Sequence, residues 1–255
     1  DELFSGYNKH QALFFSIQNT LLNKAFKHFG GSGKLLPSSR NSKIGNIGRQ
    51  IEKLHSGLNK GVNERYLDWA SFMDIELVKE LTNKNIENNY LKTESDQTDL
   101  FNNFLFYDFN LVLENDMLRK VDLMSMANSL EVRTPFLDHE LVQYVFSLPS
   151  SFKIDKKNKK KILKDTFKHR LPDGLFERKK HGFEVPLKKW FDKEMKLFLE
   201  ENIFKNNPMI KEGILNPYGV KKIFELWKKN SPGNTVYHIW SLVVLNSFFK
   251  KYIYN

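Results

Sequence analysis

The densest set of polar side chains able to do chemistry lies between residues 107 and 186. It begins at Asp108, whose neighbours in the sequence include Phe104, Phe106 and Phe109. A carboxylate in such apolar surroundings must be hydrogen-bonded, paired with a cation, bound to a metal or raised in pKa. The sequence leaves two interpretations open: a buried structural ion pair or cap, and a functional carboxylate.

A second polar group follows on a segment that also carries several apolar residues. Asp122, Ser125 and Ser129 can share one helix face, which leaves the apolar residues to pack elsewhere. Glu131 is a further candidate, but Arg133 is close enough in sequence to bridge it. A functional face and a simple local ion pair are both open here.

The third group is basic. Residues 153–161 contain six Lys and one Asp, and Arg178, Lys179 and Lys180 come shortly before Gly182. Such a run is usually a solvated surface. Phosphate chemistry, however, needs fixed cations to neutralise the charge that develops as pyrophosphate leaves. A glycine beside them would let the backbone approach a phosphate closely.

Composition removes several classes of protein. The 255 residues contain no Cys, which excludes disulfides, thiolate zinc sites and a Cys nucleophile within them. The seven His form no His-x-x-x-His pair and no Gly-x-Ser-x-Gly elbow occurs, which argues against zinc ligation and a Ser hydrolase. The glycine-rich segment 30–34 lacks the spacing of a phosphate-binding P-loop.

The formal net charge of +10 invites a nucleic-acid interpretation. Only seven of the 40 basic residues are Arg, however, whereas base readout and bidentate phosphate contacts favour Arg. We therefore expect a solvated Lys-rich surface and no nucleic-acid partner. No apolar run is long enough to span a membrane, and no signal peptide is recognised, so the expected location is the cytoplasm.

The elements that must position these residues are mostly helical. Apolar residues recur with a helical period, strict two-residue alternation is scarce, and residues 100–113 form a strongly apolar, buried stretch. Asp138 can cap one helix, Pro186 and Pro217 can begin two more, and no internal repeat or linker divides the chain. Helices are predicted over 9–29, 65–81, 138–148, from 186, from 216 and from 235, with loops over 31–42 and 93–98.

Several motifs, in this order, resemble the synthetase domain of the glutamine-hydrolysing asparagine synthetases. The opening Asp-Glu-Leu-Phe-Ser-Gly-Tyr is similar to that family's Asp-Glu-Leu-Phe-Gly-Gly-Tyr, and Lys120–Asp138 matches a long family motif at nearly every position. Shorter matches occur at Lys160–Lys164, Lys180–Pro186 and Tyr237–Leu242, so the resemblance extends from residue 1 to about 252.

The resemblance implies a fold. The chain is expected to be mainly α, as the helical C-terminal part of an α/β, ATP-pyrophosphatase-type (adenine nucleotide alpha-hydrolase-like) synthetase domain. Residues 1–255 are expected to be the C-terminal portion of that domain, because the family's Ser-Gly-Gly-x-Asp-Ser loop and its N-terminal Cys glutaminase are absent from them. On this interpretation the chain alone is inactive.

The resemblance also implies a reaction. ATP, with Mg²⁺, adenylates the side-chain carboxylate of aspartate and releases pyrophosphate, and ammonia taken from glutamine then attacks the acyl-adenylate and releases AMP. The implied partners are these small molecules and the glutaminase domain of the same protein, with a homodimer left open. No membrane partner is expected.

Site residues carry over from the matching motifs. Asp1 aligns with a magnesium-binding Asp, and Lys160 and Lys180 align with two phosphate-contacting lysines. Lys180 is expected to stabilise the transition state at the α-phosphate, with Gly182 beside it at the cofactor. The remaining catalytic candidates are Asp108, which would orient the centre, and Asp122 and Glu131, which would form a wall of the site and its support.

Three departures from the pattern bear on the substrate. Leu123 replaces the usual Arg, Ser5 replaces Gly, and residues 246–248 differ from the common acidic residue and Trp. One alternative is therefore amidation of another carboxylate, as in relatives that form β-lactams, cyclise peptides or act on surface polysaccharides. A second is a non-catalytic, Lys-rich binding protein.

Overall fold

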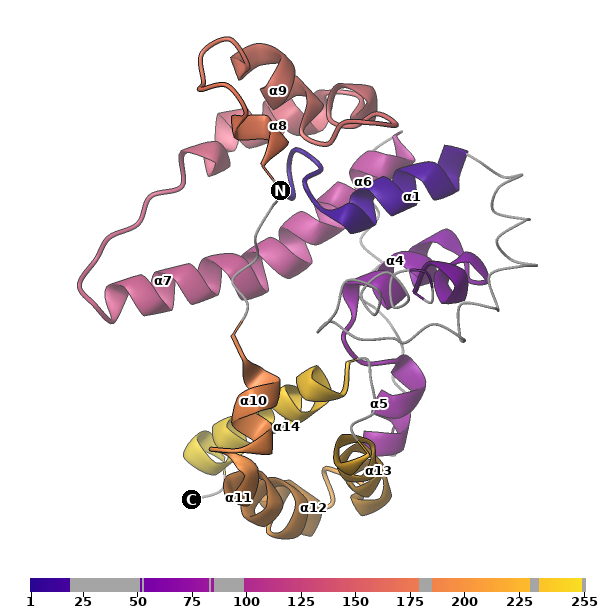
Figure 1. Cartoon of the computed structure of the whole chain (residues 1–255), viewed down its shortest axis with the longest axis vertical. Helices are drawn as coiled ribbons and strands as arrows, with labels where there is room; N and C mark the ends of the chain where they lie inside the picture. The colour runs from indigo at the N-terminus through magenta and orange to yellow at the C-terminus, as the bar shows by residue number, and fades with distance from the viewer. Residues whose placement is uncertain are drawn as a thin grey trace. The chain divides into compact units, whose positions relative to one another are not determined.

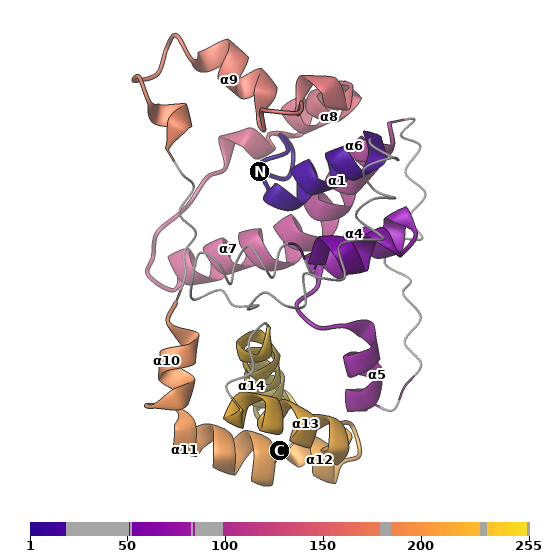
Figure 2. The same ribbon diagram turned by 45° about the vertical axis from the view of Figure 1, so that its right-hand side comes forward.

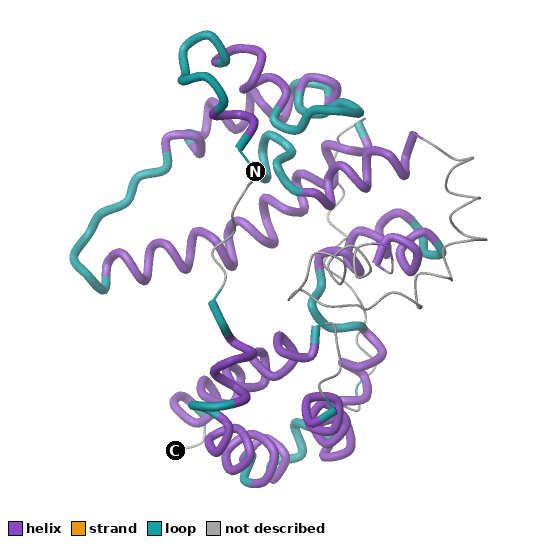
Figure 3. Tube along the Cα trace, viewed as in Figure 1, coloured by secondary structure: helices purple, strands orange, loops and turns teal. Residues whose placement is uncertain are grey.

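The computed structural model describes residues 1–18, 51, 53–82, 84, 99–178, 185–229 and 234–253. Over these ranges the chain is mainly helical, and the one strand-type pairing is an isolated antiparallel bridge between Ile154 and Lys159 (Figure 3). The prediction of a mainly helical chain is confirmed. Within the same ranges no helix is long and apolar enough to cross a membrane.

The chain divides into two compact units, and each is built from two separate segments. Unit 1 comprises Asp1–Ala25 and Asn89–Lys180, and unit 2 comprises Phe26–Asn88 and His181–Asn255. Figure 1 labels the α-helices. The described elements of unit 1 are α1 (Asn8–Gln18), α6 (Leu100–Asp108), η3 (Phe109–Leu118), α7 (Arg119–Met126), η4 (Pro135–Leu137), α8 (His139–Ser147), η5 (Ser150–Phe152), α9 (Lys161–Phe167) and η6 (Leu175–Glu177).

The core of unit 1 lies between α1 and α6, which run side by side (Figures 1 and 2). Phe14 of α1 meets Phe101 of α6 edge to face at a centroid separation of 5.9 Å, and Phe104 and Leu105 are fully buried. The helix α6 is capped by Asp99, whose carboxylate accepts the N–H groups of residues 101 and 102. It continues through the wider π-type turns of η3 into α7. The predicted buried stretch 100–113 is confirmed in part: half of its residues are buried, whereas Leu100 and Asn110 are exposed.

Unit 2 is a helical cluster with its own core. Its described elements are α4 (Val62–Ala70), α5 (Ile75–Thr82), α10 (Leu187–Asp192), α11 (Lys196–Phe198), η7 (Leu199–Lys205), α12 (Pro208–Lys211), α13 (Pro217–Lys228) and α14 (Thr235–Tyr252). The predicted starts of α13 and α14 are confirmed: Asn216 accepts the N–H of Tyr218, and α14 begins at Thr235. Phe191, Ile203, Ile223 and Ile239 meet at the fully buried centre of this unit.

Some predicted helix boundaries are wrong. The helix predicted over 65–81 is two helices, because the backbone becomes extended at Ser71 and Asp74 begins a new helix by accepting the N–H of Glu76. The helix expected from Pro186 ends at Asp192, where Lys193 leaves the helical conformation. The helix predicted over 9–29 is seen as α1, and its remainder and both predicted loops lie outside the described residues.

Candidate active site

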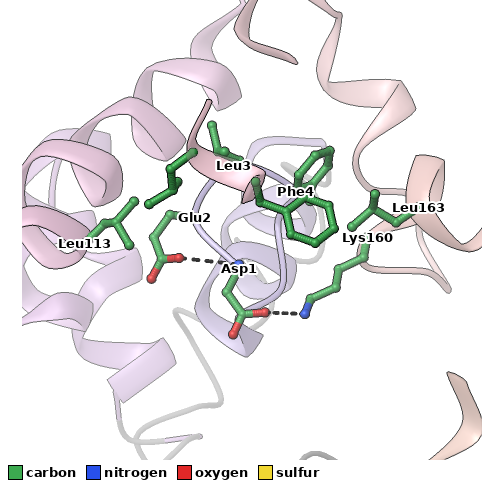
Figure 4. Close-up of a pocket in the computed structure, with 9 residues that line it drawn as sticks. Asp1, Glu2, Leu3, Phe4, Leu113, Lys160 and Leu163 are labelled. Atoms are coloured by element: carbon green, nitrogen blue, oxygen red, sulfur yellow. Dashed lines mark ion pairs between the residues drawn. The ribbon is translucent and has the colours of Figure 1, made fainter. Parts of the chain in front are cut away.

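Asp1 and Lys160, two predicted site residues that lie far apart in the sequence, form an ion pair in unit 1. The ammonium of Lys160 lies 2.6 Å from Oδ1 of Asp1 (Figure 4). The Asp1 side chain is 17% exposed and the Lys160 side chain 41% exposed, so the pair sits at the surface with its cation accessible. The structure therefore brings the expected magnesium ligand and one expected phosphate contact to the same place.

The backbone around this pair is closed tightly. The N–H of Gly6 donates to the carbonyl of Asp1 at 2.8 Å, and the N–H of Lys160 donates to the carbonyl of Phe4 at 3.2 Å. Ser5 and Lys160 both adopt left-handed backbone conformations, with φ of 58° and 54°. A β-carbon on Gly6 would lie 1.9 Å from Oδ1 of Asp1, so the loop can hold the pair only with glycine at this position.

A pocket of about 140 Å³ opens beside the pair. Its wall combines apolar and polar surface, and Phe4 and Phe136 meet there edge to face at 5.8 Å. The lining residues are Asp1, Glu2, Leu3, Phe4, Leu113, Phe136, Leu137, Lys160 and Leu163, which come from four separate stretches of unit 1. A wall of apolar side chains together with the charged groups of Asp1, Glu2 and Lys160 suits a small molecule that carries both kinds of surface.

Glu2, next to Asp1, is held by Tyr7. The Tyr7 hydroxyl donates to Oε1 of Glu2. Burial opposes ionisation of Glu2, whereas the hydrogen bond from Tyr7 favours it, and the pKa of Glu2 is lowered. Burial and the Glu2 carboxylate together raise the pKa of Tyr7 above its usual range. Glu2 therefore stays ionised and fixed at the pocket, and Tyr7 stays protonated.

Asp108 is fully buried, as its apolar sequence context suggests. Its Oδ2 lies 2.6 Å from Nε2 of His10, and its Oδ1 lies 2.6 Å from the Lys9 ammonium. Burial lowers the pKa of His10, so the imidazole is neutral and donates its Nε2 hydrogen to Asp108. Of the two interpretations left open by the sequence, the structure shows the ion pair, and Asp108 does not line the pocket.

Two other catalytic candidates, Asp122 and Glu131, are not brought to the pair. Asp122 is exposed on α7, and Glu131 forms an exposed ion pair with Arg133, the local bridge that the sequence left open. The shared face expected for Asp122, Ser125 and Ser129 is not formed, because α7 ends at Met126 and Ser129 has a left-handed φ of 54°. Lys180 and Gly182 lie outside the described residues.

Lys153 is a residue that sequence reasoning missed, because it counts as one more member of the Lys run. It is fully buried, its ammonium donates to Oδ1 of Asn102 at 2.7 Å, and it lies 5.2 Å from the centroid of the Phe146 ring. Burial lowers its pKa to about 8. No local pattern marks this lysine, since its partner is 51 positions away in the sequence.

The described residues contain no group of three or more His, Cys, Asp or Glu able to enclose a metal ion. Mg²⁺ does not require such a cage, because proteins commonly bind it through one or two carboxylates together with substrate phosphates and water. The Asp1 carboxylate is a donor of that kind, and Lys160 beside it could bind the same phosphates. These residues fit a shared magnesium and phosphate site.

The chain is similar to several proteins named asparagine synthetase [glutamine-hydrolyzing]. The chain is 28% identical over 205 residues to asparagine synthetase [glutamine-hydrolyzing] 1 of Bacillus subtilis, which covers 76% of this chain and 31% of that protein. It is 42% identical over 79 residues to asparagine synthetase [glutamine-hydrolyzing] 3 of the same organism, covering 31% of this chain and 13% of the relative. No solved structure matches the chain.

A relative from Cricetulus griseus, asparagine synthetase [glutamine-hydrolyzing], is 32% identical over 145 residues, covering 49% of this chain and 24% of that protein. The chain thus spans about a third or less of the length of these relatives. A family model for asparagine synthase matches residues 1–250, nearly the whole chain. The chain therefore belongs to the asparagine synthase family.

Proposed function

We propose that the protein containing this chain catalyses the ATP-dependent, AMP-forming amidation of aspartate to asparagine with ammonia from glutamine. Membership of the asparagine synthase family supports this reaction class. The observation that carries the proposal is the Asp1–Lys160 pair at the edge of a pocket. It places a carboxylate that could hold Mg²⁺ next to a cation that could bind phosphate.

The chemistry needs activation, because a free carboxylate is a poor electrophile. Attack of the aspartate carboxylate on the α-phosphorus of ATP forms the acyl-adenylate and releases pyrophosphate. Ammonia then adds to the acyl carbon, and AMP leaves with the bonding electrons of the broken C–O bond. Each step builds negative charge on phosphate oxygens, so fixed cations lower the barrier.

The residues of this chain have distinct roles in that scheme. Lys160 would bind the departing pyrophosphate, since its ammonium is accessible and held by the loop that contains Asp1. Asp1 would hold Mg²⁺, which when bound neutralises phosphate charge. Lys180 would stabilise the charge at the α-phosphate. The nucleotide-binding loop and sheet of the ATP-pyrophosphatase fold, and the glutaminase that supplies ammonia, would lie in other parts of the protein.

A second candidate function differs in the acceptor, which is the carboxylate that becomes amidated. Leu123 is apolar and 53% exposed, and it stands where the resembled family usually has an Arg. A missing cation would weaken recognition of an acceptor with a second carboxylate, such as aspartate. Amidation of a different carboxylate by the same adenylation chemistry is therefore the alternative.

The deciding experiment supplies the full-length protein with ATP, Mg²⁺, glutamine and aspartate, and measures AMP and asparagine. We expect both products in equal amounts. AMP formed only with another carboxylate would select the alternative acceptor, and no AMP with any carboxylate would refute the proposal. Lys160→Met should reduce AMP formation by about a hundredfold, as expected for a positioned electrostatic group, whereas the exposed Lys157→Met should not.

A further inference from the structure

Lys153 is buried, although the other lysines of the run 153–161 are exposed or half-buried. Its side chain is fully buried, and in the part of the chain that the structure describes no carboxylate forms an ion pair with it. Burial of the ammonium costs free energy that the nearby Asp99 carboxylate only partly offsets, and the lowered pKa of Lys153 reflects that cost. A methionine would fill a similar volume without it, so packing alone does not account for the lysine.

The contacts of Lys153 lead to the first turn of α6. Its ammonium donates to Oδ1 of Asn102 at 2.7 Å, and Nδ2 of Asn102 donates to the carbonyl of Leu148 at 2.9 Å. Asp99, which caps α6, also accepts the N–H of Ser150 at 2.7 Å. The segment 148–153 is therefore tied to the beginning of α6 by three hydrogen bonds.

The same residue closes the turn that carries Lys160. The carbonyl of Lys153 accepts the N–H of Lys161 at 2.9 Å, and Ile154 pairs with Lys159 one step further in. Inside the turn, Oδ1 of Asp155 accepts two backbone N–H groups at 2.7 Å. Lys153 thus lies at one end of a closed turn. Lys160 lies at the other end, next to Lys161, which is hydrogen-bonded to Lys153.

The helix α6 also holds the segment that carries Asp1. Asp108, the last residue of α6, binds Lys9 and His10, which lie in the first turn of α1 just after the loop 1–7. Asn102 and Asp108 are six residues apart on one rigid helix, and each binds one of the two segments whose side chains meet at the Asp1–Lys160 pair.

We propose that Lys153 is a positioning residue: by binding Asn102 it fixes the turn 153–161 on α6, so that Lys160 reaches Asp1 and, in the proposed function, the pyrophosphate of ATP. Only the reference to ATP rests on the proposed function. Lys153 itself touches neither substrate nor metal in this scheme, since it is fully buried.

The first test measures the ion pair without measuring activity. Acetic anhydride modifies exposed lysines, and peptide mass spectrometry of the full-length protein gives the rate at Lys160. Pairing with Asp1 slows this rate, and Asp1→Asn gives the rate for the unpaired lysine. We expect Lys153→Met to raise the Lys160 rate toward that of Asp1→Asn, and the control Lys157→Met to leave it unchanged. An unchanged rate in folded Lys153→Met would overturn the proposal.

A second variant keeps the test valid if Lys153→Met fails to fold because it leaves Asn102 unpaired. Replacing both partners of a buried hydrogen bond by apolar groups of similar shape can be nearly neutral for stability. The double variant Asn102→Leu/Lys153→Met also loses the hydrogen bond from Asn102 to the Leu148 carbonyl, but it leaves no amide oxygen unpaired. It should therefore unfold closer to the wild-type temperature than Lys153→Met does, and still show fast labelling of Lys160. Slow labelling in the folded double variant, or loss of folding only when both partners are replaced, would assign Lys153 to stability alone.

The activity readout is a double-mutant cycle between Lys153→Met and Lys160→Met. A small misplacement of a positioned group can cost up to about a hundredfold in rate. If Lys153 acts through Lys160, its substitution lowers AMP formation in the wild type and has no further effect in Lys160→Met. Multiplying effects would contradict the proposal. Wild-type activity in Lys160→Met would refute the role of Lys160 in the proposed function, while the labelling rates would still decide the positioning role.

Discussion

The Nε2 atom of His10 lies 2.6 Å from Oδ2 of Asp108, and neither side chain is exposed to solvent. The Lys9 ammonium occupies the other oxygen of the same carboxylate at 2.6 Å. Two consecutive residues of α1 thus bind both oxygens of one carboxylate at the last residue of α6. This contact holds the segment that follows the Asp1 loop, so it links the core of unit 1 to the candidate site.

Asp108→Asn should strongly destabilise the protein. The amide cannot neutralise Lys9, and removing one partner of a buried ion pair costs about 3–5 kcal/mol. Urea denaturation should therefore show a lower free energy of unfolding by this amount. Asp116→Asn is the matched control, because Asp116 pairs with Lys120 at 3.6 Å on the exposed surface of the same helical stretch. Its cost should stay below about 1 kcal/mol, and equal losses would contradict a special role of burial.

His10 should make stability depend on pH in the acidic range. Burial lowers the pKa of His10 below its ordinary value of 6.5, so the unfolded chain takes up this proton at a higher pH than the folded protein. The free energy of unfolding must then fall as the pH drops below 6.5, by at most about 1.4 kcal/mol per pH unit. Denaturation at pH 8 and 5.5 should show the stability advantage of wild type over His10→Gln shrinking at the lower pH.

Lys153 should make stability depend on pH in the alkaline range, and with the same sign as His10 does in the acidic range. Its pKa is about 8 in the folded protein and 10.5 in the reference state, so between these values only the unfolded chain keeps the proton. Stability therefore rises with pH through this window, on the order of 3 kcal/mol in total. Because methionine does not titrate, the stability of wild type relative to Lys153→Met should increase from pH 8 to 10.5. A constant difference would show that Lys153 titrates normally.

Local features of this fold could be predicted from sequence, whereas the buried polar contacts could not. Asp138 accepts the N–H groups of residues 140 and 141, and Asn216 caps α13, since a cap depends on only a few neighbouring residues. Lys153 and Lys160 look alike in the sequence, and they differ because Asn102 and Asp1, far away in the chain, bind them. The partners of Asp108 are equally distant.

Two further differences between the predicted and the observed structure also arise from features that sequence patterns do not show. Apolar residues continue with a helical period from 65 to 81, so periodicity does not register the break, although Asp74 is a suitable start signal for α5. The two units are each formed from two separate segments, and such an arrangement produces no linker that a pass along the sequence could find. The long motif 120–138 indicates the family. It does not indicate that Asp122 and Glu131 are exposed, which only the structure shows.

Ser5→Gly should stabilise the protein. Ser5 has a φ of 58°, where a β-carbon is strained, and its fully buried hydroxyl has no hydrogen-bond partner among the described residues. Relief of the left-handed strain should raise the free energy of unfolding by about 1 kcal/mol, measured by urea denaturation. Ser125→Gly, inside α7, should lower it by about 0.5–1 kcal/mol instead. If both glycines destabilise alike, the strain at Ser5 is not a significant cost.

Gly6→Ala should damage the candidate site more than the fold. The new β-carbon would lie 1.9 Å from Oδ1 of Asp1 and 2.6 Å from Cε of Lys160. Both atoms belong to flexible side-chain ends, so these can move aside and the backbone can keep its place. The thermal unfolding temperature should therefore change little, whereas the Asp1–Lys160 pair should separate.

The expected consequences of Gly6→Ala are faster acetylation of Lys160 and a loss of AMP formation of about tenfold or more in the full-length protein. Gly61→Ala is the control, because its β-carbon would meet only Oε2 of Glu64, at 3.9 Å, before α4. It should leave both readouts unchanged. If Gly6→Ala separates the pair and AMP formation stays at the wild-type rate, then the pair is not needed for adenylation, and Lys160 must bind pyrophosphate without help from Asp1 or not at all.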